Sequence, residues 1–172
     1  MACHTGPVNQ WGPSGYGDPC GACGFDWSIT ETGAAGVIAG APGRFGALLA
    51  GRDGTGRAPG LAWDAREYVW HVADNLRIWA ERLSVLTPGA TLPVAPYDQD
   101  RLAEARGYGR MPLTSARWSL GQSSAQWTAL WPSVPGDGRL LHPESGVMEV
   151  GQVLRQVAHD TFHHQHDVER SV

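Results

Sequence analysis

The chain has no lysine: all 13 of its basic residues are arginines, and only 17% of its 172 residues are charged. The absence of lysine excludes Schiff-base chemistry and a lysine general base. A formal net charge of −4 argues against a dedicated binder of nucleic acid or of an anionic membrane, because such proteins carry a basic surplus. No run of about 18 apolar residues is present, so no transmembrane helix is expected. A basic segment followed by an apolar one is missing at the start, which predicts a cytoplasmic protein.

Cysteine is scarce as well, and all three cysteines lie in the first 26 residues, a segment rich in glycine and proline. Such a composition predicts an irregular arm that needs a cross-link, a metal or docking to become ordered. Cys20 and Cys23 form a CxxC pair, and with Cys3 and His4 they would supply the four ligands of a structural Zn2+ site. The alternatives are a redox-active CxxC pair or two reduced thiols without a metal.

Apolar residues recur at helical spacing in four long stretches, which predicts an all-α four-helix bundle. The stretches are residues 28–52, kinked or interrupted by Pro42; residues 64–86; a helix from Pro112 that stops before Pro132; and residues 149–170. A short helix capped by Asp98 is predicted over residues 98–106. No stretch alternates with period two, so no strand is predicted. The predicted domain division is therefore an arm over residues 1–26 and a bundle over residues 27–172.

The last predicted helix carries four of the seven histidines, together with an aspartate. At about 100° per residue, Asp160 and His164 fall on the apolar, core-facing side. His159, His163 and His166 fall on the opposite side, as orienting or solvent-facing residues. An ionised aspartate facing the core is costly unless it is paired or ligated, so Asp160 and His164 are favoured as metal ligands over His159 and His163. A solvated polar face without any metal is the third interpretation.

A further histidine lies in the stretch 64–86, where Glu67, His71 and Asp74 follow one another at spacings of four and three residues. His71 is at the edge of the apolar stripe of that helix. A lone histidine there is usually a hydrogen-bonded structural residue. A carboxylate spaced to orient it, and a second histidine-bearing helix, favour a metal ligand instead.

These two helices resemble a known family. The motifs W-x3-E-x3-H-x2-D, from Trp63, and H-D-x2-H-H-x2-D-V, from His159, are similar to those of the DinB/YfiT-like superfamily. They are closer still to its actinobacterial branch, which is related to the mycothiol-dependent maleylpyruvate isomerases and S-transferases. The segments PYDQDRLAEARGYGRMPL and HPESGVMEVGQVLR resemble that group too. The resemblance covers Trp27 to Val168, and some relatives carry a similar CxxCGFD arm.

The resemblance implies an up-down-down-up four-helix bundle, commonly dimeric, with one divalent metal on three side chains. Carried over to this chain, the ligands are His71, Asp160 and His164, in agreement with the phase count. The sequence departs from the family pattern at Asp160, where histidine or glutamate is usual. A shorter carboxylate there would weaken the site or leave His163 as the ligand.

The function that the resemblance implies is a thiol S-transferase. A divalent metal, Zn2+ or alternatively Ni2+ or Fe2+, would activate a low-molecular-weight thiol such as mycothiol for attack on a small electrophilic substrate. Glu67, Asp74 and Asp167 would orient imidazoles or move protons, and Arg82 or Arg155 would hold a substrate carboxylate. The expected partners are therefore the small substrate and the thiol, with a homodimer implied by the family and no nucleic acid or membrane.

Two other functions use the same residues. The departure at Asp160 and the added arm suggest a non-catalytic metal-binding or interaction bundle. A metal-dependent hydrolase would activate water instead of a thiol at the same site.

Overall fold

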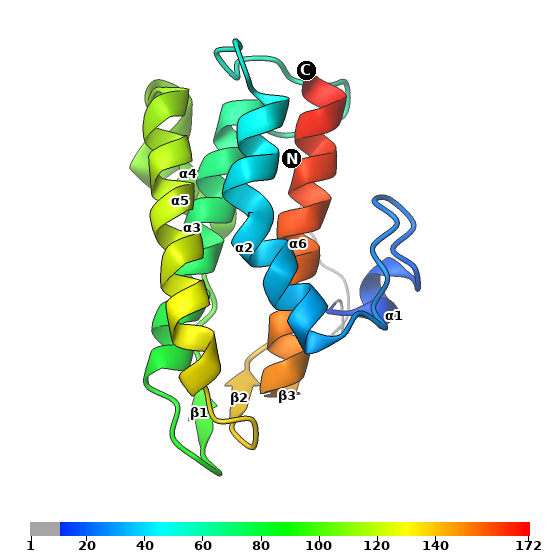
Figure 1. Cartoon of the computed structure of the whole chain (residues 1–172), viewed down its shortest axis with the longest axis vertical. Helices are drawn as coiled ribbons and strands as arrows, with labels where there is room; N and C mark the ends of the chain where they lie inside the picture. The colour runs from blue at the N-terminus through cyan, green and yellow to red at the C-terminus, as the bar shows by residue number, and fades with distance from the viewer. Residues whose placement is uncertain (1–10) are drawn as a thin grey trace.

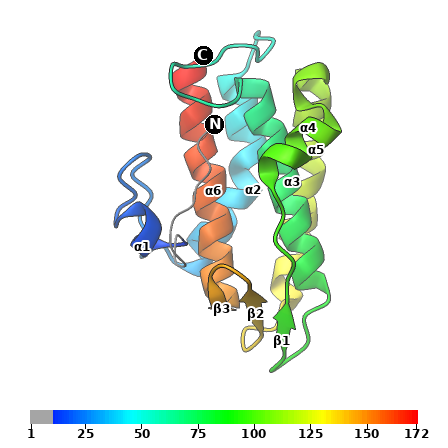
Figure 2. The ribbon, with the colours of Figure 1, turned by 180° about the vertical axis from the view of Figure 1, so that it is seen from behind.

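Four long helices stand side by side in the computed structural model, which describes residues 11–172 (Figure 1). They are α2 (Glu31–Leu48), α3 (Ala65–Ser84), α5 (Leu113–Leu130) and α6 (Val150–Ser171). Each packs on two neighbours, in the ring order α2, α5, α3 and α6. The chain runs up α2 and down α3, crosses back along the bundle, and then runs down α5 and up α6 (Figures 1 and 2). The expected up-down-down-up four-helix bundle is confirmed.

Capping side chains set the starts of three helices. The Thr30 hydroxyl accepts a hydrogen bond from the Gly33 amide at 3.1 Å at the start of α2. Asp64 and Glu67 form a reciprocal capping box at the start of α3. Asp98 caps α4 (Gln99–Arg106), as predicted. These bonds satisfy backbone amides that the first turn of a helix leaves without an internal partner.

Pro42 is expected from the sequence to kink or interrupt the helix; the prediction of an interruption is wrong, because α2 continues through this residue as one helix. Proline has no amide hydrogen, so the Ile38 carbonyl four residues earlier loses its helical partner. The Ser124 hydroxyl of α5 donates a hydrogen bond to that buried carbonyl at 2.9 Å. A neighbouring helix thus replaces the missing bond, which the sequence around Pro42 does not reveal.

The core lies between the four helices. Its largest fully buried side chains include Phe45, Leu76, Tyr108, Trp127 and Leu154. On the side of α6 that the helical phase assigns to the core, Val150, Val153, Val157, Thr161 and Val168 are buried, and Asp160 and His164 are half-buried. The helical phase counted from the sequence is therefore correct for α6.

The prediction of no strands is wrong, although the strands are very short. They are β1 (Thr91–Pro93), β2 (Arg139–His142) and β3 (Gly146–Glu149), in the order β1-β2-β3 at the lower end of the bundle (Figure 1). β1 and β2 are parallel, with Leu92 opposite Leu140, and β2 and β3 are antiparallel. Three or four residues are too few for an alternating pattern to stand out in the sequence. The sheet joins the crossover segment, which we define as residues 85–112 between α3 and α5, to the hairpin of β2 and β3 that precedes α6.

The N-terminal arm, from Trp11 to Trp27, lies against α6 (Figures 1 and 2). It contains one helical turn, α1 (Pro13–Tyr16), and two buried aromatic side chains, Phe25 and Trp27. Phe25 contacts Phe162 of α6, with ring centroids 5.8 Å apart. The arm therefore covers a second face of α6, opposite the core. This contact explains why the apolar residue Phe162 lies among polar residues on that face.

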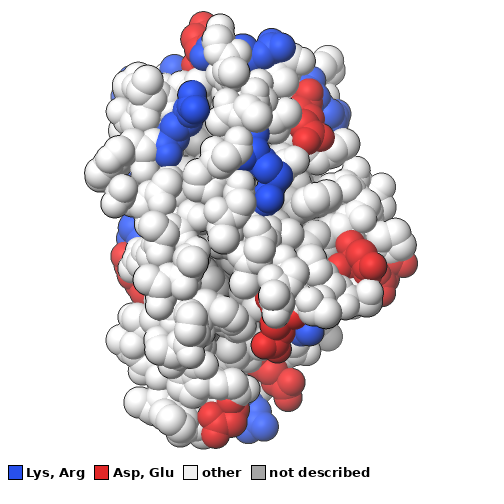
Figure 3. Space-filling model, viewed as in Figure 1, with Lys and Arg blue, Asp and Glu red and all other residues white. Residues whose placement is uncertain are grey.

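Charged side chains are scattered over a mostly uncharged surface on the face shown in Figure 3. Within residues 11–172, every helix is too short or too polar to cross a membrane.

Candidate metal centre

His71, Asp160 and His164 come together where α3 packs against α6, with one potential ligand atom of each lying within 4.8 Å of the others. The Nε2 atom of His71 is 3.5 Å from one Asp160 oxygen, and the Nε2 atom of His164 is 3.5 Å from the other. Asp160 and His164 share one side of α6 because residues four apart on a helix are stacked. The structure therefore places the three predicted ligands next to one another.

Neighbouring side chains hold two of these residues in place. The Asn75 amide donates a hydrogen bond to Asp160 at 2.7 Å, and the Tyr97 hydroxyl donates to the Asn75 oxygen at 3.1 Å. The Asp167 carboxylate is 2.9 Å from the Nδ1 atom of His164, so the other ring nitrogen faces Asp160. Such contacts fix the orientation of metal ligands. Neither Asn75 nor Tyr97 was predicted to belong to the site, although Asn75 follows His71 at a spacing of four residues.

The carboxylates make this a region that favours positive charge. Burial by itself would lower the pKa of His164, but Asp160 and Asp167 outweigh it and raise that pKa to about 9. Burial would likewise raise the pKa of Asp160, but the imidazoles of His164 and His71 hold it well below its usual range.

His71 shows that the residues fit a metal ion. The residue is only 2% exposed, and its buried Nε2 atom makes no hydrogen bond, although an Asp160 oxygen lies 3.5 Å away as an ion-pair contact. An unsatisfied buried polar group costs about 1–3 kcal/mol, so such an atom calls for an explanation. A cation between His71, Asp160 and His164 would provide the partner. Two imidazoles and a carboxylate suit Zn2+, Ni2+ or Fe2+, and three protein ligands leave a coordination position open.

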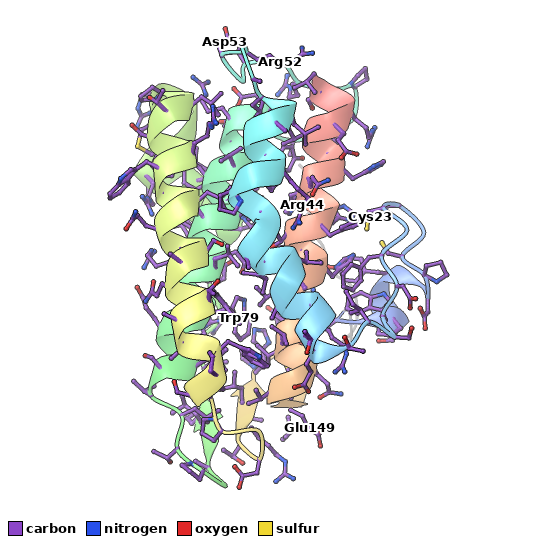
Figure 4. The ribbon with its side chains drawn as sticks, viewed as in Figure 1. Cys23, Arg44, Arg52, Asp53, Trp79 and Glu149 are labelled. Carbon is purple, nitrogen blue, oxygen red and sulfur yellow. The ribbon has the colours of Figure 1, made fainter. Side chains whose placement is uncertain are left out.

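A cavity of about 210 Å³ opens onto this centre. Its walls come from α3, α6, the crossover segment, β2 and the arm, and include Trp11, Tyr16, Trp79, Arg82, Tyr97 and His142. The Arg82 guanidinium lies over the Trp79 ring, 4.4 Å from its centroid; Figure 4 labels Trp79 in the lower half of the bundle. Arg82 also donates a hydrogen bond to the Ala95 carbonyl. Arg155 does not line the cavity, and it is bound to the backbone carbonyls of Ile29 and Gly151. Of the two arginines predicted to hold a substrate, the structure places Arg82 in the cavity wall.

The three carboxylates predicted to assist catalysis lie in different surroundings. Asp167 contacts His164, as described above. Glu67 accepts a hydrogen bond from the Asp64 amide at 2.8 Å in the capping box of α3. Asp74 is buried and accepts hydrogen bonds from the Tyr108 hydroxyl and the Arg106 guanidinium. The structure thus brings Asp167 to the centre and gives Glu67 and Asp74 contacts within the frame of the bundle.

The expectation that His159 faces solvent or orients another ligand is wrong. Its side chain is 2% exposed, packed between the rings of Tyr16 and Trp27, whose centroids each lie 4.5 Å from its own. The phase count predicted the side of α6 correctly, but the arm covers that side. His166 is partly exposed, 3.9 Å from Glu169.

The arm also brings Cys20 and Cys23 to His159 and His163, the pair considered as alternative ligands of the main centre. The Cys20 sulfur is 4.0 Å from the Nδ1 atom of His163, and both cysteines are free. Burial raises the pKa of the Cys23 thiol to about 11, whereas a redox-active cysteine has a lowered pKa. Cys3 and His4, the other two residues of the predicted zinc site, lie outside the described residues.

The fold and the centre define a class of protein: an up-down-down-up helical bundle with a His-Asp-His site at a cavity between two of its helices. The model of the DinB superfamily matches residues 43–168, a range that contains all three residues of the centre. The chain belongs to the DinB superfamily.

A solved structure with the same fold is YfiT from Bacillus subtilis, with a TM-score of 0.69 and 19% sequence identity over 83% of this chain and 88% of that chain. YfiT is described as a probable metal-dependent hydrolase with an unusual four-helix bundle topology. At 19% sequence identity, the similarity to YfiT shows that the two chains share a fold and nothing more. A comparison with curated protein sequences finds no match.

Proposed function

We propose that the chain is a metal-dependent enzyme in which His71, Asp160 and His164 hold one divalent cation, Zn2+ or alternatively Ni2+ or Fe2+. The observation that carries the proposal is the buried Nε2 atom of His71, which makes no hydrogen bond and faces an Asp160 oxygen 3.5 Å away beside a cavity. The description of YfiT as metal-dependent supports the same assignment.

The residues around the centre would perform distinct tasks. A divalent cation with an open position lowers the pKa of a water or thiol that reaches it. Asp167 holds the imidazole of His164 through Nδ1 and keeps Nε2 turned towards Asp160. Asn75, itself held by Tyr97, fixes the Asp160 carboxylate.

The reaction that we propose is thiol S-transfer: a low-molecular-weight thiol of the mycothiol type loses its proton to solvent, its sulfur forms a C–S bond with an electrophilic carbon of a small substrate, and the group displaced from that carbon leaves with the bonding electron pair. This assignment rests on the resemblance of the two histidine-bearing motifs to the mycothiol-dependent branch of the superfamily. Arg82 in the cavity wall would bind a carboxylate on the electrophile. The proposed partners are these two small molecules and, as in the family, a second copy of the chain.

Hydrolysis is the second candidate, and the description of YfiT as a hydrolase favours it. The same side chains would then hold a cation that lowers the pKa of a water molecule, and no thiol would be consumed.

The first test is the metal content of the purified protein and of His71→Ala and His164→Ala. We expect each variant to lose one equivalent of metal relative to the wild type. His166→Ala, a change of a partly exposed histidine on the same helix, is the matched control and should lose none. An unchanged metal content in His71→Ala would overturn the proposal.

The second test separates the reactions. Metal-loaded protein is incubated with mycothiol and a panel of small electrophiles, and separately with a panel of esters and amides. Consumption of thiol that disappears in His71→Ala supports transfer, and thiol-independent cleavage supports hydrolysis. Metal binding with neither reaction would support the non-catalytic bundle and overturn the assignment as an enzyme.

A further inference from the structure

A second group of metal-binding side chains lies on the side of α6 that faces the arm. Cys20 and Cys23 come from the arm, and His159 and His163 from α6, one turn apart. One sulfur or nitrogen atom of each lies within 4.8 Å of the others. Figure 4 shows Cys23 on the arm beside α6. We propose that these four residues bind one Zn2+ ion as a structural Cys2His2 site, which fastens the N-terminal arm to the last helix.

The distances agree with such a site. Zn–S bonds of about 2.3 Å and Zn–N bonds of about 2.0 Å in a tetrahedron separate neighbouring ligand atoms by roughly 3.3–3.8 Å. The Cys20 sulfur and the His163 Nδ1 atom are 4.0 Å apart. Small side-chain rotations are therefore enough to bring the ligands into the coordination shell, and the backbone can stay in place.

His159 gives an independent reason to expect a ligand here. Both of its ring nitrogens are buried without a hydrogen-bond partner. A neutral imidazole always carries one donor and one acceptor, so a histidine enclosed by aromatic rings leaves two polar atoms unsatisfied. Zn2+ bound to one ring nitrogen would give that nitrogen a partner. Aromatic packing alone would be served better by a phenylalanine.

The local backbone of the arm suits two cysteine ligands. The chain between them is the CxxC segment, whose spacing is common in zinc sites. Gly24 follows with a φ of 76°, a conformation that side-chain-bearing residues rarely adopt, and its amide donates to the Cys20 carbonyl at 2.8 Å. This turn folds the segment back on itself, and the Cys20 amide donates to the Phe25 carbonyl at 2.9 Å.

The charge of the site also balances. On binding, the two thiols lose their protons to solvent, and two thiolates with two neutral imidazoles around Zn2+ form a neutral cluster. A neutral cluster can be buried among Tyr16, Phe25 and Trp27 without the cost of an unpaired charge. All four positions are filled by protein atoms, which is typical of a structural rather than a catalytic zinc.

The site would shape the cavity of the main centre. Trp11 and Tyr16 of the arm line that cavity, and the Gly12 amide donates to the Gln156 side chain of α6 at 2.9 Å. A zinc ion joining the arm to α6 would thus hold one wall of the cavity in position. This inference does not depend on the proposed reaction, because it concerns different residues and a different kind of site.

Cobalt substitution tests the proposal directly. Protein refolded with Co2+ in place of zinc should show sulfur-to-cobalt charge-transfer absorption, which a His-Asp-His centre cannot give. We expect this absorption to disappear, with loss of one equivalent of metal, in Cys20→Ser/Cys23→Ser and in His159→Gln. It should persist in His71→Ala, which removes only the main centre.

Cys3→Ser is the matched control for the cysteine variants. If the absorption and one equivalent of metal were lost in Cys3→Ser and retained in His159→Gln, the Cys2His2 assignment would be overturned in favour of Cys3 as a ligand. A wild-type protein without any sulfur-to-cobalt absorption would also overturn it.

Limited proteolysis of the unmodified protein covers the case in which the variants do not fold. The arm contains no lysine or arginine, but its aromatic residues are sites for chymotrypsin. We expect cleavage in the arm to become at least about tenfold faster after metal removal by a chelator, and to return to its original rate when Zn2+ is added back. An arm equally resistant with and without metal would contradict the proposal.

Discussion

Asn75 provides a sharp test of how the main centre is built, because it touches a proposed ligand and none of the residues of the second site. Its side chain is buried, and its amide donates to Asp160 at 2.7 Å while its oxygen accepts from Tyr97 at 3.1 Å. Asn75→Ala would leave the Asp160 carboxylate free to turn away from His71 and His164.

Loss of a residue that orients a metal ligand typically lowers metal affinity about 10- to 100-fold, which corresponds to about 1.4–2.7 kcal/mol. We expect Asn75→Ala to lie in this range. Tyr97→Phe removes only the bond that orients Asn75, so we expect a loss of less than about 10-fold. The loss of metal affinity should therefore be larger in Asn75→Ala, which removes a contact to Asp160, than in Tyr97→Phe, which removes a contact to Asn75.

The assay is competition for Zn2+ between the metal-free protein and a chromophoric chelator. His71→Ala identifies which binding step belongs to the main centre. Gln99→Ala changes another side chain of the cavity wall and serves as the control, with unchanged affinity expected. An affinity of Asn75→Ala for Zn2+ within about twofold of the wild-type value would refute the reasoning. The hydrogen bond from Asn75 would then not orient Asp160 for metal binding.

Three further predictions concern the frame of the bundle and its metals. Ser124→Ala leaves the Ile38 carbonyl without a partner and should lower the free energy of unfolding by about 1–3 kcal/mol in urea denaturation; half-buried Ser119→Ala on the same helix should change it by less than about 0.5 kcal/mol. Tyr108→Phe removes a bond to the buried Asp74 carboxylate and should cost about 1.5–3 kcal/mol with the metal content unchanged, whereas loss of metal would place Asp74 in the site after all. Zn2+ added to metal-free protein at 100 times the Kd of one centre should stabilise the fold by about 2.7 kcal/mol. A midpoint temperature of thermal unfolding that does not change on addition of Zn2+ would contradict metal binding by the native state.

The main centre was largely predictable because its information is local and periodic. The spacing of Asp160 and His164 and the apolar positions around them determine which side of the helix faces the core, and the structure agrees. His71 lies only at the edge of the apolar stripe of its helix, and the spacing of its neighbouring carboxylates and the family resemblance led to its proposal as a ligand. The hydrogen bond between Tyr97 and Asn75 could not be predicted from the sequence. Tyr97 lies in the crossover segment, and the position of this segment depends on its packing along α3.

Glu67 and Asp74 show the limit of spacing arguments. Both stand at positions from which a carboxylate can orient His71, but Glu67 caps the start of α3, and Asp74 accepts hydrogen bonds from half-buried Arg106 and buried Tyr108. Which partner a carboxylate meets depends on elements that are distant in sequence, here Arg106 and Tyr108.

The amino-acid sequence by itself determined the helical bundle, its capping residues and the inward face of α6, because these follow from periodicity and local hydrogen bonding. Tertiary structure alone decided that α2 continues through Pro42 and that His159 is buried. It also decided that Cys20 and Cys23 meet histidines of α6. Each of these depends on a contact between segments far apart in the chain, such as Ser124 with Ile38 or the arm with α6. Such contacts are selected by the packing of the whole molecule, and no single segment encodes them.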